Sequence, residues 1–304
     1  MESSLINLSN ELAGIVQALD PYLVSVRARR HYPSSGFLWG SDVVVTADHT
    51  IQRDEDIAVT FAGGKTIGAT LAGRDPGTDL AILKTEAPGQ SGAGVGRADG
   101  VKAGELALVL GRSPDSGVNA SLGIVSATSG PWRTWRGGQL DGYIRLDAKM
   151  FPNSSGGAVV NARGEIIGIA TPVLSRIAGL AIPVSTVKRV VEKLLEKGFV
   201  PRGYLGIGVQ AIPFHEELRQ RLSVPNKSGL IVLTVESNGP ADKAGVLIGD
   251  IVTGLGELAA EQADDLQAFS DSRMIGKSVS VKFIRGGELK ESMLTIAERP
   301  RRRG

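Results

Sequence analysis

Short apolar runs separated by turn residues fill the first two thirds of the chain. Runs of about four to eight residues, rich in Val, Ile and Leu and bounded by Gly, Pro, Asn or Asp, predict β-strands. Six such runs precede residue 85 and six follow residue 105: 23–26, 35–39, 42–47, 57–61, 66–72 and 80–84, then 106–111, 120–127, 143–146, 158–161, 166–171 and 180–182. Short strands with frequent turns are typical of barrels and sandwiches, and this division favours two six-stranded barrels.

Two segments have helical periodicity instead. The first carries apolar residues at helical spacing up to Pro21: Leu5, Leu8, Leu12, Ile15, Val16 and Leu19. This stripe predicts an amphipathic helix that packs on its own domain or on a neighbouring subunit. The second has charged residues opposite an apolar face made of Val187, Val190, Val191, Leu194 and Leu195. It predicts a helix that Ser185 could cap and that Gly198 ends.

Composition places the chain among ordinary soluble globular proteins. Two domains are expected from 304 residues, of which 42% are hydrophobic and 22% charged. The 40 glycines suit a mostly β protein with numerous hairpins. Because the net charge is only +2, electrostatics favour neither an acidic partner nor nucleic acid, and the basic residues 299–303 are interpreted as a solvated tail.

The sequence predicts no cofactor. There is no cysteine, so there is no disulfide framework and the redox compartment stays undetermined. His31 lies in a predicted loop with no second ligand at metal spacing, so we expect no metal site. Gly63-Gly64-Lys65-Thr66 resembles the end of a P-loop, but the earlier glycine and a following helix are missing, so a hairpin turn explains it better.

The N-terminus lacks the basic region and the unbroken apolar run of a signal peptide. No stretch approaches the ~20 apolar residues that a membrane-spanning helix needs. We therefore expect a cytoplasmic protein, or a periplasmic or extracytoplasmic one if a leader has been removed.

Three side chains next to predicted strands could together perform nucleophilic catalysis. His49 follows an apolar strand, Asp79 precedes one, and Ser155 stands in the segment Pro152-Asn153-Ser154-Ser155-Gly156-Gly157. Serine is a poor nucleophile at neutral pH, because it needs a base to take its proton, and the base needs a carboxylate to fix its tautomer. The order His, Asp, Ser predicts a catalytic triad.

Each of these residues also has a simpler interpretation. Ser-Gly-Gly is commonly just a turn, a single histidine is more often packed or at the surface, and an aspartate can simply open a strand. Ser154 is a weaker candidate than Ser155, because the Gly-Gly pair must follow the reactive serine directly. Asp48 is weaker than Asp79, because neighbouring strand side chains point to opposite faces and Asp48 would point away from the ring of His49.

These segments resemble the HtrA family of chymotrypsin-fold serine proteases, which carry a C-terminal PDZ domain. The resemblance runs from about Val24 to Pro300. It rests on the histidine box at 46–49, the aspartate box at 73–84, the serine box at 146–148 and 152–157, and the strands at 164–169 and 180–183. It implies a mostly β fold: a chymotrypsin-like double β-barrel followed by a PDZ domain, with an N-terminal helix. It also implies a homo-oligomer, a trimer.

By resemblance, the N–H groups of Asn153 and Ser155 form the oxyanion hole, and here the chain departs from the family. Asn153 stands where the family usually has Gly, Ser154 replaces Asn or Asp, and Ala158 replaces Pro. Backbone N–H groups form such a hole, so a side chain is not fatal in itself. If the position needs a positive φ, Asn tolerates it better than other non-glycine residues.

Two further segments bear on specificity and control. In trypsin-like enzymes the residue at the base of the substrate pocket lies six residues before the nucleophile. In this chain that residue is Lys149, so we expect that Lys and Arg are not preferred before the cut.

The segment 130–138 holds two tryptophans and two arginines. By resemblance it is a regulatory loop; the alternative is tryptophans packed on the barrel and arginines in solvent.

The second domain resembles a PDZ domain. Tyr204, Leu205, Gly206 and Ile207 match its carboxylate-binding loop, and residues 239–252 match its core. Such a domain binds a C-terminal peptide as an added strand, and a helix near 264–272 would form the other wall of the groove. The expected division is an N-terminal helical segment 1–20, a trypsin-like domain 21–199, a PDZ domain 200–299 and a basic tail 300–304.

Together these features predict a serine endopeptidase that cleaves unfolded or damaged proteins without ATP. Ser155 would attack the scissile carbonyl, His49 would act as general base and then general acid, and Asp79 would orient His49. The rival prediction is a protease-fold scaffold with little or no activity that binds partners through its PDZ domain. Asn153 and Ser154 favour the rival, and the intact triad opposes it.

Overall fold

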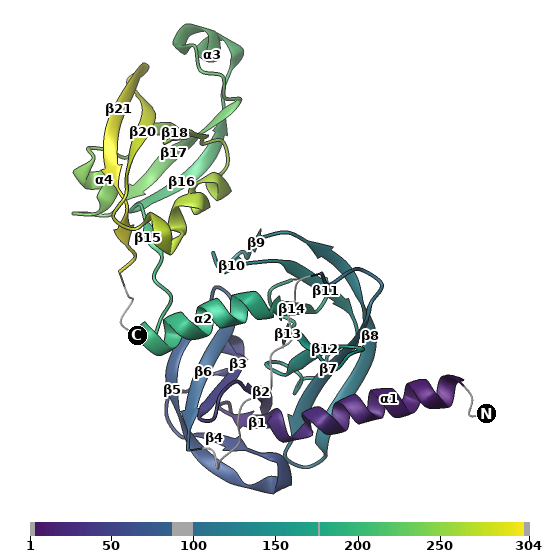
Figure 1. The fold of residues 1–304 in the computed structure, drawn as a ribbon. Helices are drawn as coiled ribbons and strands as arrows, with labels where there is room; N and C mark the ends of the chain where they lie inside the picture. Colours follow the sequence, from purple (N-terminus) through teal and green to yellow (C-terminus); the bar gives the residue numbers. More distant parts are fainter. Residues whose placement is uncertain (1–3, 87–99, 176, 301–304) are drawn as a thin grey trace. The chain divides into compact units, whose positions relative to one another are not determined.

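The chain folds into two compact units. The structure, a computed structural model, describes residues 4–86, 100–175 and 177–300. Its contacts divide the chain into Met1–Val200 and Pro201–Gly304, and each unit has a hydrophobic core of its own (Figure 1).

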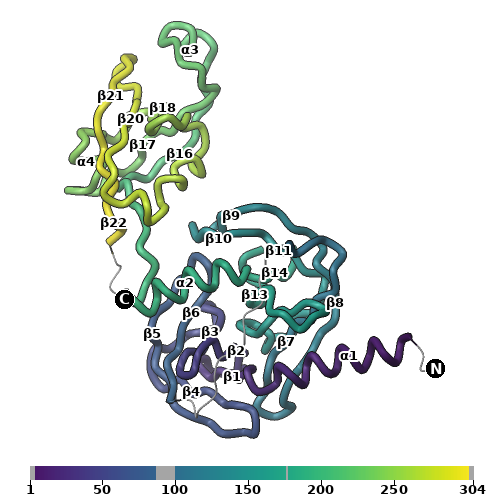
Figure 2. Tube along the Cα trace, viewed as in Figure 1, coloured from purple at the N-terminus to yellow at the C-terminus, as the bar shows by residue number. Residues whose placement is uncertain are grey.

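The first unit contains two closed six-stranded barrels, whose traces can be followed in Figure 2. The first barrel has the hydrogen-bonded order β1-β2-β3-β6-β5-β4, and its strands are β1 (Leu23–Arg27), β2 (Ser34–Leu38), β3 (Val43–Ala47), β4 (Ile57–Thr60), β5 (Thr66–Asp75) and β6 (Leu80–Thr85). The second has the order β11-β14-β13-β12-β7-β8, and its strands are β7 (Leu106–Ser113), β8 (Gly117–Ser129), β11 (Tyr143–Asp147), β12 (Ala158–Asn161), β13 (Ile166–Thr171) and β14 (Leu180–Pro183). The predicted double barrel is confirmed, and each predicted strand is present with its ends shifted by a few residues.

Burial on both faces explains why many of these strands are apolar without a break. All five residues of β3 are buried. Val44 packs with Val24 in one cluster of the first barrel, whereas Val45 belongs to a second cluster that also contains Leu110 of the second barrel. A strand with a core on each side loses the alternation of polar and apolar residues.

Short connections complete this unit. The 3₁₀ turns are η1 (Asp20–Tyr22), η2 (Asp48–Thr50) and η3 (Ala62–Gly64), and the two-residue strands β9 (Trp132–Arg133) and β10 (Gln139–Leu140) pair with each other. η3 joins β4 to β5, and its Gly63 and Gly64 have φ of 80° and 84°, which only glycine adopts readily. The P-loop-like tetrapeptide is therefore a hairpin turn, as predicted.

Helix α1 (Ser4–Leu19) contacts the core of the first unit through its second half. Leu12, Ile15 and Leu19 contact the core, whereas 75% of Leu5 and 50% of Ile6 are exposed. Across the residues that the structure describes, no helix is both long and apolar enough to span a membrane.

Helix α2 (Val184–Lys197) contacts β5 and β6 of the first barrel and β13 and β14 of the second. Gly198 ends the helix in a left-handed conformation, with its N–H bonded to the carbonyl of Leu194, as predicted. The predicted cap is wrong: Pro183 occupies the N-cap and Ser185 lies inside the first turn. The reason is that β14 runs directly into the helix, so the chain has no loop in which a serine could cap.

The second unit is a sheet of order β16-β17-β18-β20-β21, with β19 paired to β18 and a separate pair of β15 and β22. Its strands are β15 (Gly203–Tyr204), β16 (Ile207–Pro213), β17 (Ser228–Val235), β18 (Ile251–Leu255), β19 (Leu258–Ala259), β20 (Ser278–Arg285), β21 (Glu288–Thr295) and β22 (Ala297–Glu298). The helices are α3 (Glu216–Leu222) and α4 (Pro240–Lys243), and the 3₁₀ segments are η4 (Ala263–Ser270) and η5 (Ser272–Met274). The helix predicted near 264–272 is therefore two 3₁₀ segments, because Asp271 is extended and its carboxylate caps η5 by accepting from the N–H of Arg273.

Candidate active site

The structure brings the three predicted triad side chains together. The two atoms His49 Nε2 and Ser155 Oγ are 3.2 Å apart. On the other side of the ring, His49 Nδ1 lies 3.0 Å from Asp79 Oδ1 and 2.9 Å from Asp79 Oδ2. Both contacts are within the reach that proton transfer needs. One imidazole therefore links the serine hydroxyl to the carboxylate.

Neighbouring strand ends position His49 and Asp79. His49 lies in η2, directly after β3, and Asp79 lies in the turn before β6. Because β3 and β6 are paired, with Ala47 opposite Leu80, the two residues emerge at the same end of the barrel. Asp79 has a φ of 59°, a left-handed conformation that Asp adopts more readily than most residues.

The carboxylate of Asp79 is fully buried and accepts several hydrogen bonds. The backbone N–H of His49 donates to Oδ1 at 2.9 Å, and Thr171 Oγ1 donates to Oδ2 at 2.5 Å. Sequence reasoning missed Thr171, which ends the apolar strand β13 and is itself buried. A hydroxyl at the end of a strand that is otherwise wholly apolar was the one signal available. These donors satisfy the oxygens of a carboxylate that is withdrawn from water.

Asp48 has a different partner, in agreement with its exclusion from the triad. Its carboxylate Oδ1 accepts from Arg74 Nε at 2.5 Å, and 3% of the residue is exposed. Burial raises the pKa of Asp48, and the hydrogen bond and charge of Arg74 oppose that rise. Asp48 thus serves as an anchor for Arg74, whose guanidinium also donates to the carbonyl of Ile51.

The loop between β11 and β12 presents Ser155 and withdraws Ser154. Ser154 is 1% exposed, and its Oγ accepts the N–H of Phe151 at 3.2 Å. Gly156 has a φ of 82°, and a Cβ there would lie 2.4 Å from the carbonyl oxygen of Ser35. A Cβ on Gly157 would lie 2.0 Å from the carbonyl oxygen of Leu110. Both glycines are therefore required by close packing, and Ser155, which is 5% exposed, directly precedes them with its Oγ next to His49 Nε2.

The two predicted oxyanion donors lie on the same loop. Among the described residues, the N–H groups of Asn153 and Ser155 donate no hydrogen bond. The carbonyl of Ser154 accepts the N–H of Gly157 at 2.9 Å. Asn153 does not have the positive φ that was considered for it, so its backbone is compatible with a side chain. Its carbonyl accepts from Ser35 Oγ of β2 at 2.5 Å.

Lys149 does not point into a buried pocket. The residue is exposed, and its Nζ lies 4.9 Å from the centre of the Phe151 ring. The next residue, Met150, is partly buried, and its sulfur would lie 2.6 Å from a Cβ placed on Gly179. Neither Lys149 nor Met150 supplies a carboxylate that could pair with a basic substrate side chain.

The segment 130–138 is half packed and half exposed. Trp132 packs edge-on against Tyr143 with ring centres 5.1 Å apart, whereas 68% of Trp135 is exposed under the guanidinium of Arg136. Thr134 is buried, and its Oγ1 donates to the carbonyl of Gly77 at 2.7 Å. The segment is therefore tied to the turn that carries Asp79. Of the two tryptophans that the packing alternative places on the barrel, Trp132 packs there and Trp135 does not, and the regulatory role stays a prediction.

The predicted peptide-binding loop lies at the start of an edge strand. Among the described strands β16 pairs only with β17, and η4 packs beside it. The carbonyls of Leu205 and Gly206 accept N–H groups of Ala241 and Glu236, while their own N–H groups donate to no acceptor in the described part of the chain. Burial raises the pKa of Tyr204, with the charge and hydrogen bond of Glu236 adding to the rise. An exposed strand edge next to free N–H groups is what a C-terminal peptide requires.

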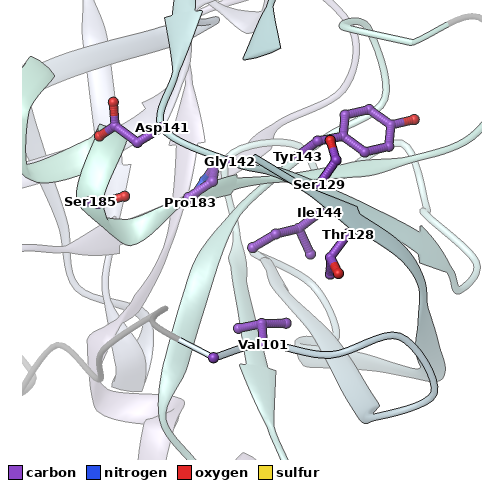
Figure 3. A pocket seen from close by; sticks show the side chains of 10 residues that line it. Val101, Thr128, Ser129, Asp141, Gly142, Tyr143, Ile144, Pro183 and Ser185 are labelled. Atoms are coloured by element: carbon purple, nitrogen blue, oxygen red, sulfur yellow. The ribbon is translucent and has the colours of Figure 1, made fainter. Parts of the chain in front are cut away.

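A separate hollow of about 240 Å³ lies in the second barrel and includes no triad residue (Figure 3). Asp141 and Ser185 lie on one side of it, and Thr128 and Tyr143 lie on the other. Asp141 is already paired with Arg189 Nη2 at 2.9 Å. Within the described residues, no group of three or more His, Asp or Glu side chains could hold a metal ion.

Comparison with known proteins agrees with this geometry. Residues 34–169 match the model of the trypsin-like peptidase domain, and residues 203–296 match the model of the PDZ domain. A probable periplasmic serine endoprotease DegP-like of Brucella suis is 33% identical over 278 residues, which are 89% of this chain and 53% of the relative. A protein of the same name in Ectopseudomonas mendocina is 30% identical over 88% of this chain and 56% of its own length. The chain thus spans about half the length of the curated relatives it matches.

Solved structures are similar along nearly the whole chain. The HtrA-type protease AlgW, solved with a decapeptide, has a TM-score of 0.76 and 26% identity, covering 95% of this chain and 99% of its own. The serine endoprotease from Yersinia pestis has a TM-score of 0.75 and 27% identity, covering 99% of this chain and 100% of its own. With a trypsin-like peptidase domain followed by one PDZ domain, the chain belongs to the HtrA family of serine proteases.

Proposed function

We propose that the chain is a serine endopeptidase that uses Ser155 as nucleophile, His49 as general base and then general acid, and Asp79 to orient His49. The observation that carries the proposal is the single imidazole between Ser155 Oγ and the buried carboxylate of Asp79. Asp79 fixes the proton on Nδ1, so that Nε2 can accept the proton of Ser155. The N–H groups of Asn153 and Ser155 then stabilise the negative charge that develops on the substrate oxygen.

The test of this proposal compares two adjacent serines. A fluorophosphonate probe should label the wild type and the Ser154→Ala variant but not Ser155→Ala. Cleavage of an unfolded casein-like substrate should fall by about 10⁴-fold or more in Ser155→Ala and remain mostly intact in Ser154→Ala. Equal losses from both substitutions would overturn the choice of nucleophile.

The proposed substrates are unfolded or damaged proteins, cleaved without ATP. The HtrA family membership supports this substrate class, and the absence of a nucleotide motif in the sequence supports ATP independence. The second unit would bind C-terminal peptides along β16, with the carboxylate at the N–H groups of residues 204–207. The peptide complex of AlgW supports peptide binding by relatives of this chain.

Location and assembly also remain proposals. The relatives are named as periplasmic proteases, which favours the periplasmic alternative over the cytoplasmic one. A homo-oligomer, a trimer by family resemblance, is consistent with the exposed apolar residues Leu5 and Ile6 of α1. Light scattering of the purified chain would measure its mass directly.

A weakly active scaffold is the second candidate, because Asn153 and Ser154 depart from the family pattern. The buried hydroxyl of Ser154 and the ordinary φ of Asn153 weaken this candidate, since both residues fit the loop without displacing Ser155. Under this alternative the wild type would bind peptides through its PDZ domain and react with no fluorophosphonate.

A further inference from the structure

Arg29 belongs to the first barrel but binds a loop of the second barrel, the nucleophile loop (residues 148–157, between β11 and β12). It follows β1, and its Nη2 donates to the carbonyl of Pro152 at 3.0 Å, although the two residues are 123 positions apart. Pro152 directly precedes Asn153, the predicted oxyanion donor. One guanidinium therefore contacts the peptide group that supplies the N–H of the proposed oxyanion hole.

The geometry of a peptide group makes this contact significant. The peptide bond is planar and trans here, so the C=O of Pro152 and the N–H of Asn153 point in opposite directions. An interaction that fixes the carbonyl also fixes the N–H. Residues 152–154 lie outside the helices and strands, and the N–H of Ser154 donates to the carbonyl of Phe151 at 2.9 Å, so Pro152 and Asn153 are the central residues of a turn. That bond closes the turn but does not involve the C=O of Pro152 or the N–H of Asn153, the two groups of the middle peptide plane. A charge-assisted hydrogen bond, roughly twice as strong as a neutral one, can then decide which way the plane faces.

Hydrogen bonds to two carbonyls of the β1–β2 connection hold the Arg29 side chain in place. Its Nε donates to the carbonyl of Tyr32 and its Nη2 also lies 3.3 Å from the carbonyl of Pro33. These bonds close the β1–β2 connection around the guanidinium and orient its rigid fork. The side chain is half-buried, and burial lowers the pKa of Arg29, which still leaves it cationic at neutral pH.

The carbonyl on the other side of Asn153 is also held by the first barrel. Ser35 of β2 donates through Oγ to the carbonyl of Asn153, and Ser35 Oγ in turn accepts the N–H of Arg112 at 2.8 Å. Ser35 is fully buried, so this bond is shielded from water. The peptide planes before and after Asn153 are therefore both fixed through their carbonyls, and Arg29 fixes the one that carries the Asn153 N–H.

We propose that Arg29 is a positioning residue that keeps the N–H of Asn153 turned toward the oxyanion hole by binding the carbonyl of Pro152. This inference rests on the proposed endopeptidase activity. Without the guanidinium, the Pro152–Asn153 peptide can rotate and withdraw one of two donors from the transition state. Such a loss acts on the transition state and leaves substrate binding almost unchanged.

The competing role for Arg29 is purely local, because it also binds the carbonyls of Tyr32 and Pro33. A local role predicts lower stability without a specific loss in kcat. Arg30, which is exposed, provides the matched control, since Arg30→Gln removes a neighbouring positive charge from the same connection. Arg29→Lys keeps the positive charge but removes the planar guanidinium with its several N–H donors.

The experiment measures kcat and KM of the full chain on a fluorogenic peptide, together with thermal unfolding and binding of a peptide boronate that mimics the tetrahedral intermediate. We expect Arg29→Gln to lower kcat by about 10- to 100-fold, which is a smaller loss in kcat than removal of an oxyanion donor causes. The KM of this variant should stay within about twofold of the wild-type value. Boronate affinity should fall by a similar factor, Arg29→Lys should retain part of kcat, and Arg30→Gln should match the wild type. In Arg29→Ala, low millimolar methylguanidinium should raise kcat several-fold, whereas methylammonium should not.

Four outcomes would overturn the inference: kcat unchanged in Arg29→Gln, a rise in KM alone, equal losses in Arg29→Gln and Arg30→Gln, or unchanged boronate affinity. A wild type that neither cleaves peptides nor reacts with the boronate would instead overturn the proposed activity, and this inference with it.

Discussion

Replacing Asp79 with Asn tests the triad at the atom that sets the tautomer of His49. Oδ1 of Asp79 accepts the backbone N–H of His49 at 2.9 Å, so the amide oxygen of the substituted side chain must take that place. The amide NH₂ then occupies the position of Oδ2, which lies 2.9 Å from His49 Nδ1. Two donors cannot face each other, so Nδ1 must accept and the ring proton moves to Nε2. With Nε2 protonated, the imidazole cannot take the proton of Ser155.

The expected loss is about 10⁴-fold in kcat, the size of the effect of this change in trypsin-like triads. That factor corresponds to about 5.4 kcal/mol of transition-state stabilisation. The fold should survive, for two reasons. Asn adopts the left-handed φ of 59° at least as well as Asp, and the hydroxyl of Thr171 can turn to accept from the new NH₂.

The assay is turnover of a fluorogenic peptide at saturating concentration, with thermal unfolding as a check on folding. Asp48→Asn is the matched control, because Asp48 binds Arg74 and does not touch the ring of His49. It should keep kcat within about threefold of the wild type. An Asp79→Asn variant that retains a tenth of the wild-type kcat, or an equal loss in Asp48→Asn, would refute the assignment of Asp79.

Three further outcomes follow from contacts outside the triad. Because Lys149 lies exposed over the ring of Phe151, a peptide-library profile should favour small aliphatic residues before the cut; a profile dominated by Arg or Lys would contradict this arrangement. The full-length Ser155→Ala variant should bind a peptide with a free apolar C-terminus in the micromolar range and its amidated form at least about tenfold more weakly, whereas equal affinities would exclude recognition of the carboxylate by the 204–207 loop. Burial alone would raise the pKa of Asp250, but the hydrogen bonds from Arg285 and the N–H of Leu247 lower it below its usual range. The Asp250 carboxylate therefore stabilises the fold at pH values above its unfolded pKa, and this stabilisation is lost as pH falls through its lower folded pKa. In calorimetry, the unfolding temperature of the wild type should depend more steeply on pH below about 4 than that of Asp250→Asn.

The strands and the proximity of His49, Asp79 and Ser155 were predictable because their signals are local. A strand buried on both faces, such as β3, is visible as a run of valines followed by Thr46 and Ala47, and its end marks where His49 leaves the barrel. Gly156 and Gly157 identify Ser155 because a Cβ at either position would collide with backbone atoms. Each of these features depends on a few adjacent residues.

The supporting contacts were not predictable, because each joins residues that are distant in sequence. Thr171 reaches Asp79 across 92 positions, and Ser35 reaches Asn153 across 118. A threonine or serine at a strand end has no pattern of its own that distinguishes such a role. The missed cap of α2 has a related cause, since only the direct passage from β14 into the helix excludes Ser185 from the N-cap.

The nucleophile loop belongs to the second barrel in sequence, yet the first barrel fixes its conformation. The N–H of Ser35 donates to the carbonyl of Ser155 at 3.0 Å, and its Oγ holds the carbonyl of Asn153. Gly156 packs so closely on β2 and β3 that a Cβ would lie 2.5 Å from Thr46 Oγ1. His49 and Asp79, the proposed general base and its carboxylate, also come from the first barrel. A small shift between the barrels would therefore displace the proposed nucleophile, base and oxyanion donors together, and activity should be more sensitive to the inter-barrel contact than the stability of either barrel is.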